Sequence, residues 1–292
     1  MIMLTLIQLY FTINIILCNE KEGIIMSIKI AIANQKGGIG KTTTALNLAD
    51  GLVHIGYKVL FIDLDPQRNS TTTYGAKIEN TNTIVDVLKK DCKASEAIQH
   101  MPMGDIIAGD QLLVQEEMYF NSLKARENLL KRQIKEIEDE YDYIVMDTPP
   151  NLGVYMINAL TAADGCIIPI EAESYAIDGL SLLIDTVNEV VDALNEDLKI
   201  YGVLLNKYDS RNKLDRMIKE ALPEVAKEKK FYAFQTVIRI SQAIKNVQSL
   251  GNIEGGEDEI KNRSLFQSYP SSNAAIDYAN FIKELLEVRI NG

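Results

Sequence analysis

Residues 36–43 of this chain are Lys-Gly-Gly-Ile-Gly-Lys-Thr-Thr, and they follow an apolar run over 28–33 that is typical of a buried strand. Glycines here let successive backbone N–H groups turn toward phosphates, and Lys41 supplies a positive charge. The Thr42 hydroxyl suits Mg²⁺, and a helix starting at about Lys41 would add its positive dipole end. The alternative is a glycine turn that binds nothing. The strand before the loop and the Gly-Lys-Thr-Thr ending instead predict a site for a nucleoside triphosphate.

The loop departs from the usual phosphate-loop pattern. That pattern places glycine at position 35, where this chain has Gln35, and the chain carries a second lysine, Lys36. The order Lys-Gly-Gly-x-Gly-Lys-Thr-Thr resembles the deviant Walker A motif of the ParA/MinD family of ATPases. The resemblance implies ATP and Mg²⁺ as cofactors and the following nucleotide-binding residues: Lys36, Gly37, Gly38, Ile39, Gly40, Lys41, Thr42 and Thr43.

The resemblance also implies a particular role for Lys36. In this family the signature lysine reaches across a nucleotide-sandwiched dimer to the phosphates of the partner. ATP would therefore switch on homodimerisation. The alternative is that Lys36 serves the ligand of its own subunit.

Two later apolar runs end in carboxylates. The run over 59–67 contains Asp63 and Asp65, and the run over 143–150 contains Asp147. The carboxyl ends of parallel strands lie beside the phosphate loop, where a metal ion and an attacking water must be held. Each aspartate could instead be a helix cap or turn residue, but three of them in order with the loop favour a site. By resemblance, the catalytic residues are Lys36, Lys41 and Asp65, and the metal ligands are Thr42, Asp63 and Asp147.

Length and composition agree with a cytosolic α/β enzyme. The 292 residues are 47% hydrophobic and 24% charged, enough for one large core. The cysteines Cys18, Cys92 and Cys166 have no paired or metal-ligand spacing, which indicates a reducing compartment. We expect a doubly wound, mostly parallel sheet flanked by helices, in a single P-loop ATPase domain over 26–292.

The segment 1–25 differs from the rest of the chain. It is apolar as far as Cys18 and has no Lys or Arg before Lys21, so it lacks the basic region of a secretory signal. Leu17 is larger than the residue that lipoprotein cleavage prefers, and polar breaks interrupt the run before it reaches the length of a membrane helix. We expect translation to start at Met26, with 1–25 as an upstream extension outside the fold.

From residue 27 the chain alternates strand and helix patterns, as a parallel sheet with helical crossovers requires. The expected strands are 28–33, 59–63, 103–108, 143–147, 166–170 and 200–205. Helical patterns cover 42–54, 83–99, 112–140, 174–194 and 273–288. An acidic loop is expected over 251–259.

Asn206 follows the expected strand 200–205, where related ATPases place a polar residue that contacts adenine. Its amide could both donate to and accept from a purine edge. Capping of the next helix is an equally acceptable explanation of this asparagine.

The net charge is −11, yet the segment 207–245 contains ten basic and five acidic residues, a local charge of +5. Such an asymmetry suits phosphate contacts by one face of an acidic protein, although a solvated helix face would look similar. Two stretches resemble segments that partition proteins use to bind DNA. On that resemblance the expected DNA contacts are Arg211, Arg239 and Lys245.

The chain most resembles the shorter type of ParA partition ATPase, which implies a cytoplasmic, nucleoid-associated protein that segregates plasmid or chromosomal DNA. Mg-ATP would promote a homodimer that binds DNA non-specifically, and a centromere-binding ParB-type partner would stimulate its weak ATPase activity. Two alternatives are a MinD-like regulator that cycles on membranes and a positioning protein for a non-DNA cargo. The last helical pattern has mixed charge, unlike a basic membrane helix, so no stable membrane association is expected.

Overall fold

The computed structural model describes residues 27–174, 176–250 and 263–291. They form a sheet of eight strands in the order β3-β4-β2-β5-β1-β6-β7-β8. All neighbouring strands are parallel except β3 and β4, which are antiparallel. The expected doubly wound, mostly parallel fold is confirmed. The segment 1–25 and the expected loop 251–259 lie outside the described residues, so the division into a leader and one domain stays a prediction.

The strands are β1 (Ile28–Ile32), β2 (Val59–Asp63), β3 (Ile98–Met101), β4 (Gly104–Ile107), β5 (Tyr143–Asp147), β6 (Gly165–Glu171), β7 (Lys199–Tyr208) and β8 (Ala233–Arg239). The helices that bear on the site are α2 (Lys41–His54), α3 (Asn69–Tyr74), α9 (Lys213–Lys229), α10 (Gln242–Leu250) and α13 (Asn273–Asn291). The others are α4 (Ile84–Lys89), α5 (Leu112–Ser122), α6 (Leu129–Ile134), α7 (Val154–Ala162), α8 (Ala176–Ala193) and α12 (Leu265–Ser268).

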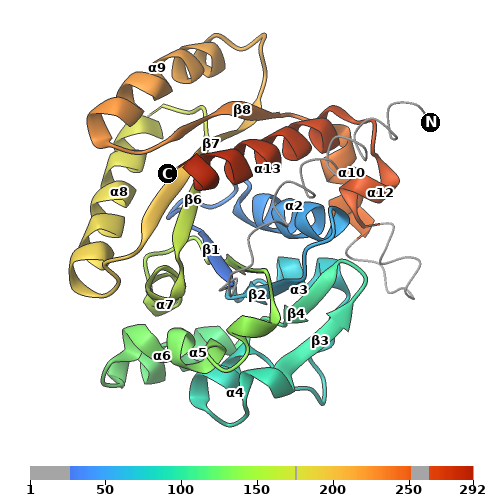
Figure 1. Ribbon diagram of the computed structural model, residues 1–292, viewed down its shortest axis with the longest axis vertical. Coiled ribbons are helices and arrows are strands. Elements are labelled where there is room, and N and C mark those ends of the chain that lie inside the picture. The colour runs from blue at the N-terminus through green and yellow to red at the C-terminus, as the bar shows by residue number, and fades with distance from the viewer. Residues whose placement is uncertain (1–26, 175, 251–262, 292) are drawn as a thin grey trace.

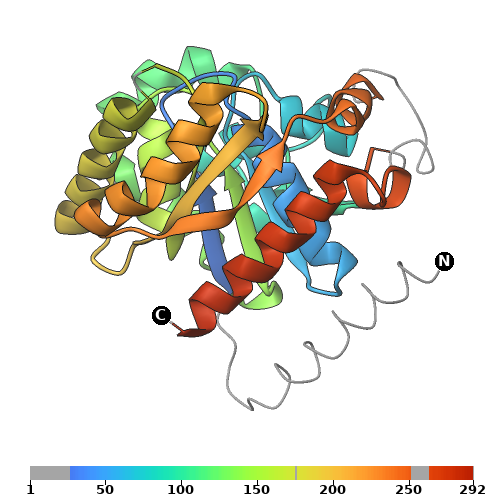
Figure 2. The same cartoon turned by 90° about the horizontal axis from the view of Figure 1, so that it is seen from above.

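Helices cover both faces of the sheet (Figure 1). Viewed from above, the strands lie between α8 on one side and α13 on the other (Figure 2). The alternation of side chains along β1 shows why two cores are needed: Ile30 and Ile32 face the core with α2 and α13, whereas Ala31 faces the core with α7 and α8. Strands buried on both faces explain the nearly unbroken apolar runs in the sequence.

Two expected helical stretches are shorter in the structure. The pattern over 83–99 becomes α4, which ends where Lys90 adopts a left-handed φ of 67°, followed by a short 3₁₀ turn and the edge strand β3. The pattern over 112–140 is divided into α5 and α6, with Ala125 at a φ of 53° between them. Left-handed residues break a helix because the following carbonyls no longer point along its axis. Neither residue is glycine or asparagine, so these breaks could not be predicted from the sequence pattern.

The last helix docks on the sheet, as expected from its mixed charge. Phe281 and Leu285 of α13 are fully buried in the core that contains β8 and α2. None of the helices in the described ranges is long and apolar enough to cross a bilayer.

Two glycines provide a matched test of the packing between β6 and β7. A Cβ on Gly165 would lie 2.4 Å from ring carbons of Tyr201, whereas one on Gly179 of α8 would meet nothing within 4 Å. We expect Gly165→Ala to lower the free energy of unfolding by about 1–3 kcal/mol because the added methyl group would overpack the contact between β6 and β7. Gly179→Ala should raise it by about 0.5–1 kcal/mol because alanine favours the helix. Urea denaturation measures both, and a shift of the same sign in the two variants would contradict this packing.

Candidate functional site

The phosphate loop connects the end of β1 to the start of α2. Gly40 occupies the N-cap position of α2 with a φ of 91°, which favours glycine. A Cβ at Gly40 would also lie 2.8 Å from the Nδ2 atom of Asn206. Backbone conformation and lack of space therefore both require glycine here, and the loop can close tightly over the end of the helix.

Lys41 is held inside this loop. Its Nζ atom donates to the carbonyl oxygen of Lys36 at 2.6 Å, which curls the side chain back along the loop. Burial lowers the pKa of Lys41, while the nearby carboxylates of Asp147 and Asp65 act in the opposite direction. The ammonium group is thus positioned where a polyphosphate would satisfy it.

Asp63 and Asp147 are neighbours at the ends of two parallel strands. They are register partners on β2 and β5, and both are completely buried. Burial raises the pKa of both carboxyl groups, and their mutual repulsion contributes to the increase for Asp147. The pair is electrostatically costly unless a cation lies nearby.

Hydroxyl groups of α3 stabilise this acidic pair. Asp63 Oδ2 accepts from the Thr71 backbone N–H at 2.9 Å and from its hydroxyl at 2.7 Å. Asp147 Oδ2 accepts from Ser70 Oγ at 2.8 Å. Neither Ser70 nor Thr71 was predicted from the sequence, where the only signal for them is a run of polar residues after the Asp63 strand.

The donor set at Asp147 fits Mg²⁺. Its Oδ1 atom is buried and has no hydrogen-bond partner in the described part of the chain. The Thr42 hydroxyl lies close to the same carboxylate and acts to lower the pKa of Asp147. The described residues hold no cluster of three His, Cys, Asp or Glu side chains for a protein-only site. One or two carboxylates completed by phosphates and water is the arrangement that Mg²⁺ commonly uses.

The structure supports the predicted roles of Asp63 and Asp65 to different degrees. Both oxygens of Asp63 already accept hydrogen bonds, from Thr71 and from the Asp65 backbone, so this residue anchors α3 and its metal role stays a prediction. Asp65 lines a cavity with Lys41, and its Oδ1 atom accepts from the Gln67 backbone at 2.9 Å. Asp65 therefore faces the space where a phosphate and water would meet.

Asn206 connects the phosphate loop to β7. Its Nδ2 atom donates to the carbonyl of Ile39 at 3.1 Å and to Thr44 Oγ1 at 3.0 Å, with a longer contact of 3.5 Å to the carbonyl of Gly40. From the sequence, helix capping is an equally acceptable role for Asn206. The structure excludes it, because Asn206 lies inside β7 and Asn212 caps α9.

These bonds fix the direction of the Asn206 amide. The Nδ2 atom is directed to the loop, so only Oδ1 is available to a ligand. That oxygen is buried without a partner among the described residues. Asn206 can therefore accept a hydrogen bond from a ligand but not donate one.

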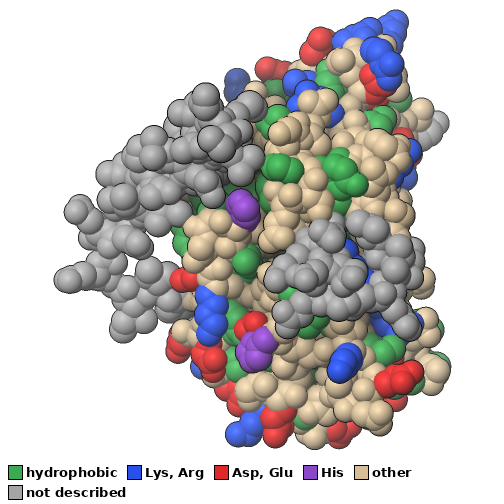
Figure 3. All heavy atoms as spheres, turned by 90° about the vertical axis from the view of Figure 1, so that its right-hand side faces the viewer, with side chains coloured by type: hydrophobic (Ala, Val, Ile, Leu, Met, Phe, Trp, Pro, Cys, Tyr) green, Lys and Arg blue, Asp and Glu red, His purple; other side chains and the backbone are tan. Residues whose placement is uncertain are grey.

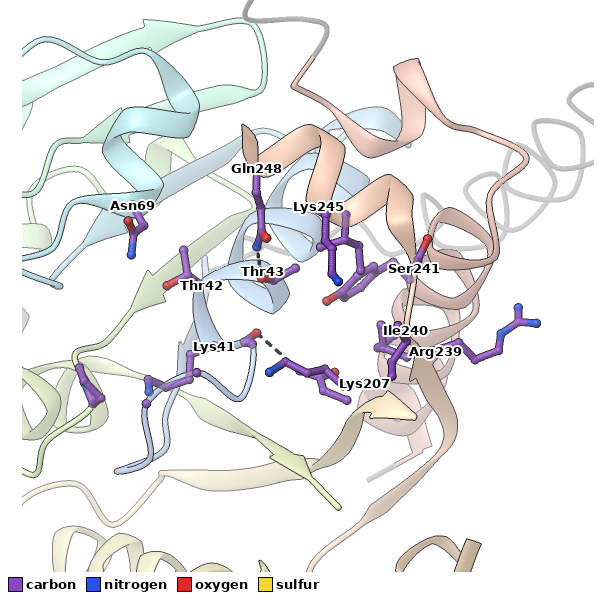
Figure 4. A pocket seen from close by; sticks show the side chains of 18 of the residues that line it. Lys41, Thr42, Thr43, Asn69, Lys207, Arg239, Ile240, Ser241, Lys245 and Gln248 are labelled. Atoms are coloured by element: carbon purple, nitrogen blue, oxygen red, sulfur yellow. Dashed lines mark hydrogen bonds between the residues drawn. The ribbon is translucent and has the colours of Figure 1, made fainter. Parts of the chain in front are cut away.

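A cavity of about 660 Å³ lies in front of the loop. Figure 4 shows Thr42 and Lys41 on one wall and Lys207, Ile240 and Lys245 on the opposite wall. Its other lining residues include Gly37, Gly38, Gly40, Thr43, Asp65, Gln67, Asn69, Pro150, Asn206, Ile238 and Tyr278. Lys36 and Ile39 are absent from this lining, although they were expected to bind nucleotide; they contribute carbonyl oxygens to Lys41 and Asn206.

Lys36 lies outside the cavity. Its Nζ atom forms an ion pair with Glu173, which follows β6, and both side chains are about half exposed at 51% and 42%. An ion pair with this exposure contributes little to stability. Lys36 is therefore free to exchange one partner for another.

The three predicted DNA contacts fall in different places. Arg211 is exposed beside α9 and pairs with Asp209 two residues earlier. Arg239 is paired with the buried Asp277 of α13 through Nη2–Oδ1 at 2.7 Å and Nε–Oδ2 at 2.9 Å. Lys245 lines the cavity. The sequence could give the charge of these residues but not the direction in which each side chain points.

The sequence has extensive similarity to known proteins. The model of a family described as an AAA domain matches residues 27–200. The chain is 40% identical to the sporulation initiation inhibitor protein Soj of Bacillus subtilis, over 73% of this chain and 86% of that protein. It is 32% identical to the chromosome-partitioning ATPase Soj of Thermus thermophilus, over 88% of this chain and 95% of that protein.

Solved structures show the same fold. A Cyanothece McdA variant in complex with ATP has a TM-score of 0.75 at 25% identity, covering 90% of this chain and 97% of that one. Cobyrinic acid a,c-diamide synthase from Mycobacterium smegmatis, with an ATP analogue and magnesium, has a TM-score of 0.73 at 29% identity, covering 89% and 94%. Similar folds thus occur in proteins with different names.

Substitution of Arg239 and of Arg211 tests which of these two arginines stabilises the fold. Arg239→Ala would leave the buried Asp277 carboxylate without its bidentate partner, so we expect the free energy of unfolding to fall by about 1–2 kcal/mol. Arg211→Ala removes an exposed local pair and should leave the unfolding curve unchanged. Thermal and urea denaturation of the two variants measure this difference. Equal stability of Arg239→Ala and the parent protein would show that the Arg239–Asp277 pair is not structural.

Proposed function

Because this chain belongs to the ParA/MinD family of partition ATPases, we propose that it forms a homodimer with bound Mg-ATP and in that state binds DNA without sequence preference. Slow hydrolysis, stimulated by a partner protein, then separates the dimer and releases the DNA. The observation that carries this proposal is the meeting of Lys41, Asp65 and Asp147 at one end of the sheet, beside the glycine loop.

ATP binding follows from the donors of the loop. Backbone N–H groups of residues 37–41 and the Lys41 ammonium hold the polyphosphate. Toward the nucleobase, Asn206 presents only its Oδ1 acceptor because its amide nitrogen is hydrogen-bonded to the loop. An acceptor at this point suits the exocyclic amine of adenine, whereas the corresponding oxygen of guanine would repel it.

Mg²⁺ would be held by Thr42 and Asp147, with Asp63 adding negative charge behind them. When bound, the ion would neutralise charge on the outer phosphates. The unpartnered Asp147 Oδ1 atom gives it an acceptor, which supports this assignment. The positive charge of Mg²⁺ would also reduce the repulsion between the buried carboxylates of Asp63 and Asp147.

We assign Asp65 to the attacking water. Its carboxylate faces the cavity beside Lys41 and could accept a hydrogen bond from water there. Phosphoryl transfer depends mainly on positioning and electrostatic stabilisation, so a single poorly placed water gives a weak basal rate. A partner that orders the site would raise this rate.

Dimerisation is assigned to Lys36. Because its pair with Glu173 is half exposed, exchange of this carboxylate for a phosphate of the partner subunit would cost little. A phosphate is also more highly charged than a carboxylate. ATP bound in one subunit would therefore recruit Lys36 from the other.

DNA binding is assigned to the end of the molecule formed by α9. Arg211 lies just before this helix, and exposed basic side chains continue along it: Lys213, Arg216, Lys219, Lys227, Lys229 and Lys230. Figure 3 shows several Lys and Arg side chains, with Asp and Glu side chains among them, at the top of the molecule, where Figure 1 places α9. Such a surface would contact backbone phosphates without reading bases.

The proposed partner is a centromere-binding ParB-type protein, and the proposed location is the cytoplasm on the nucleoid. The MinD-like alternative receives less support, since the apolar positions of α13 are used in packing. Positioning of a non-DNA cargo remains an alternative with the same DNA-binding cycle and a different partner.

Binding of the full chain to non-specific duplex DNA and to anionic liposomes tests the proposal. We expect DNA binding with ATP only, weakening as salt rises because released counterions drive it. Lys41→Ala should bind neither nucleotide nor DNA and serves as the control. Liposome binding without DNA binding would move the protein to the MinD-like alternative.

Two further substitutions separate dimerisation from hydrolysis. Asp65→Ala should bind ATP, lose turnover, and accumulate as a DNA-bound dimer. Lys36→Ala should bind ATP with nearly parental affinity yet stay monomeric. Light scattering and phosphate release measure these properties. Parental turnover in Asp65→Ala would exclude its assigned role, and a stable ATP dimer of Lys36→Ala would exclude that of Lys36.

A further inference from the structure

Helix α10 has two distinct faces. Ala243 and Val247 are buried in the core that contains α2 and α13. The adjacent face, at helical spacing, carries Ile244, Lys245 and Gln248, which line the cavity. Packing of the first face therefore fixes the second face toward the phosphate loop.

The start of α10 is anchored independently. Arg239, at the end of β8, is bound by Asp277 through its side chain and through its backbone N–H at 3.0 Å. Asp277 precedes Tyr278, which lines the cavity and lies close to Thr44 of α2. The wall formed by α10 is thus held by the same helix that supports α2.

Gln248 contacts the phosphate-loop helix directly. Its Nε2 atom donates to Thr43 Oγ1 at 2.8 Å, as the dashed line in Figure 4 shows. Thr43 directly follows the proposed metal ligand Thr42. A ligand that extends from the loop along the cavity would pass beside this contact.

Lys245 enters the cavity one turn before Gln248 (Figure 4). Within the described residues it forms no ion pair, whereas the other basic residues on this wall do: Lys207 pairs with Glu171, and Arg239 with Asp277. Among the described residues that line the cavity, Asp65 is the one acidic side chain. Lys245 is therefore a cation available to an anionic ligand.

We propose that α10 is part of the nucleotide site, and that Lys245 and Gln248 bind the inner part of the nucleotide, its α-phosphate and ribose. This assignment rests on the proposed binding of ATP and replaces a direct contact between Lys245 and DNA. Lys41 serves the outer phosphates from the loop, and Lys245 serves the inner phosphate from the opposite wall.

The assignment predicts equal effects on ATP and ADP. Both nucleotides contain the α-phosphate and ribose, so a contact there contributes the same binding free energy to each. It also contributes equally to the ground state and the transition state of hydrolysis. Loss of the contact should raise KM and leave kcat unchanged.

Calorimetric titration of the full chain with Mg-ATP and with Mg-ADP tests this inference. Lys245→Ala should weaken both affinities about tenfold, and Gln248→Ala about threefold, since a charge-assisted hydrogen bond is stronger than a neutral one. Lys245→Arg should retain most of the affinity because the charge is kept. Lys131→Ala, an exposed substitution on the distant α6, should change neither affinity.

Nucleotide affinities of Lys245→Ala within twofold of the parent protein would overturn the proposal. Loss of DNA binding at saturating ATP with those affinities unchanged would do so as well, and would return Lys245 to the DNA surface. If the parent protein itself bound no nucleotide, the proposed function would fail and this inference with it. A loss of affinity for ATP but not for ADP in Lys245→Ala would place Lys245 at the outer phosphates and contradict the assignment.

Discussion

The parallel pairing of β5 between β1 and β2 is the constraint on which the site depends. It brings the phosphate loop after β1, Asp63 on β2 and Asp147 on β5 to one edge of the sheet. An antiparallel arrangement of the same strands would place their carboxyl ends on opposite edges. Because the strands are covered by helices on both faces, this edge is also the place where polar groups can meet a ligand. Asn206 lies at the same edge on β7, which β6 separates from β1, and it fastens the loop to β7.

Burial of charge gives the site its chemical character. Lys41, Asp63 and Asp147 are all removed from water, and burial shifts the pKa of each toward its neutral form. Ser70 and Thr71 supply hydroxyl donors to the carboxylates, yet Asp147 Oδ1 stays without a partner in the described structure. A buried group in this condition favours binding of the missing charge, here a cation together with phosphates. Completing the solvation of this oxygen would then contribute to the free energy of nucleotide binding.

The opposite wall of the cavity comes from the last third of the chain. The Arg239–Asp277 pair and the packing of Ala243 and Val247 orient α10, and this orientation decides which basic residues face the cavity. Residues that are close in sequence therefore have different environments: Arg239 is committed to α13, Lys245 faces the cavity, and the basic residues of α9 face solvent. A count of charges over 207–245 joins these environments together. The structure divides the segment into a wall of the cavity and an exposed basic surface.

The sequence alone determined the fold class, the phosphate loop and the family, because these depend on local patterns: apolar runs of strand length, glycines at fixed spacing, and carboxylates directly after strands. It also placed β1, β2, β5 and β6 within one or two residues. The breaks at Lys90 and Ala125, the edge strand β3 and the position of Asn206 inside β7 were decided by tertiary packing, which overrides helix and strand patterns. The hydroxyl partners of the aspartates, the pairing of Lys36 with Glu173 and the directions of Arg239 and Lys245 were likewise invisible in the sequence. Each depends on contacts between segments far apart in the chain, and side-chain direction is fixed only when those segments pack together.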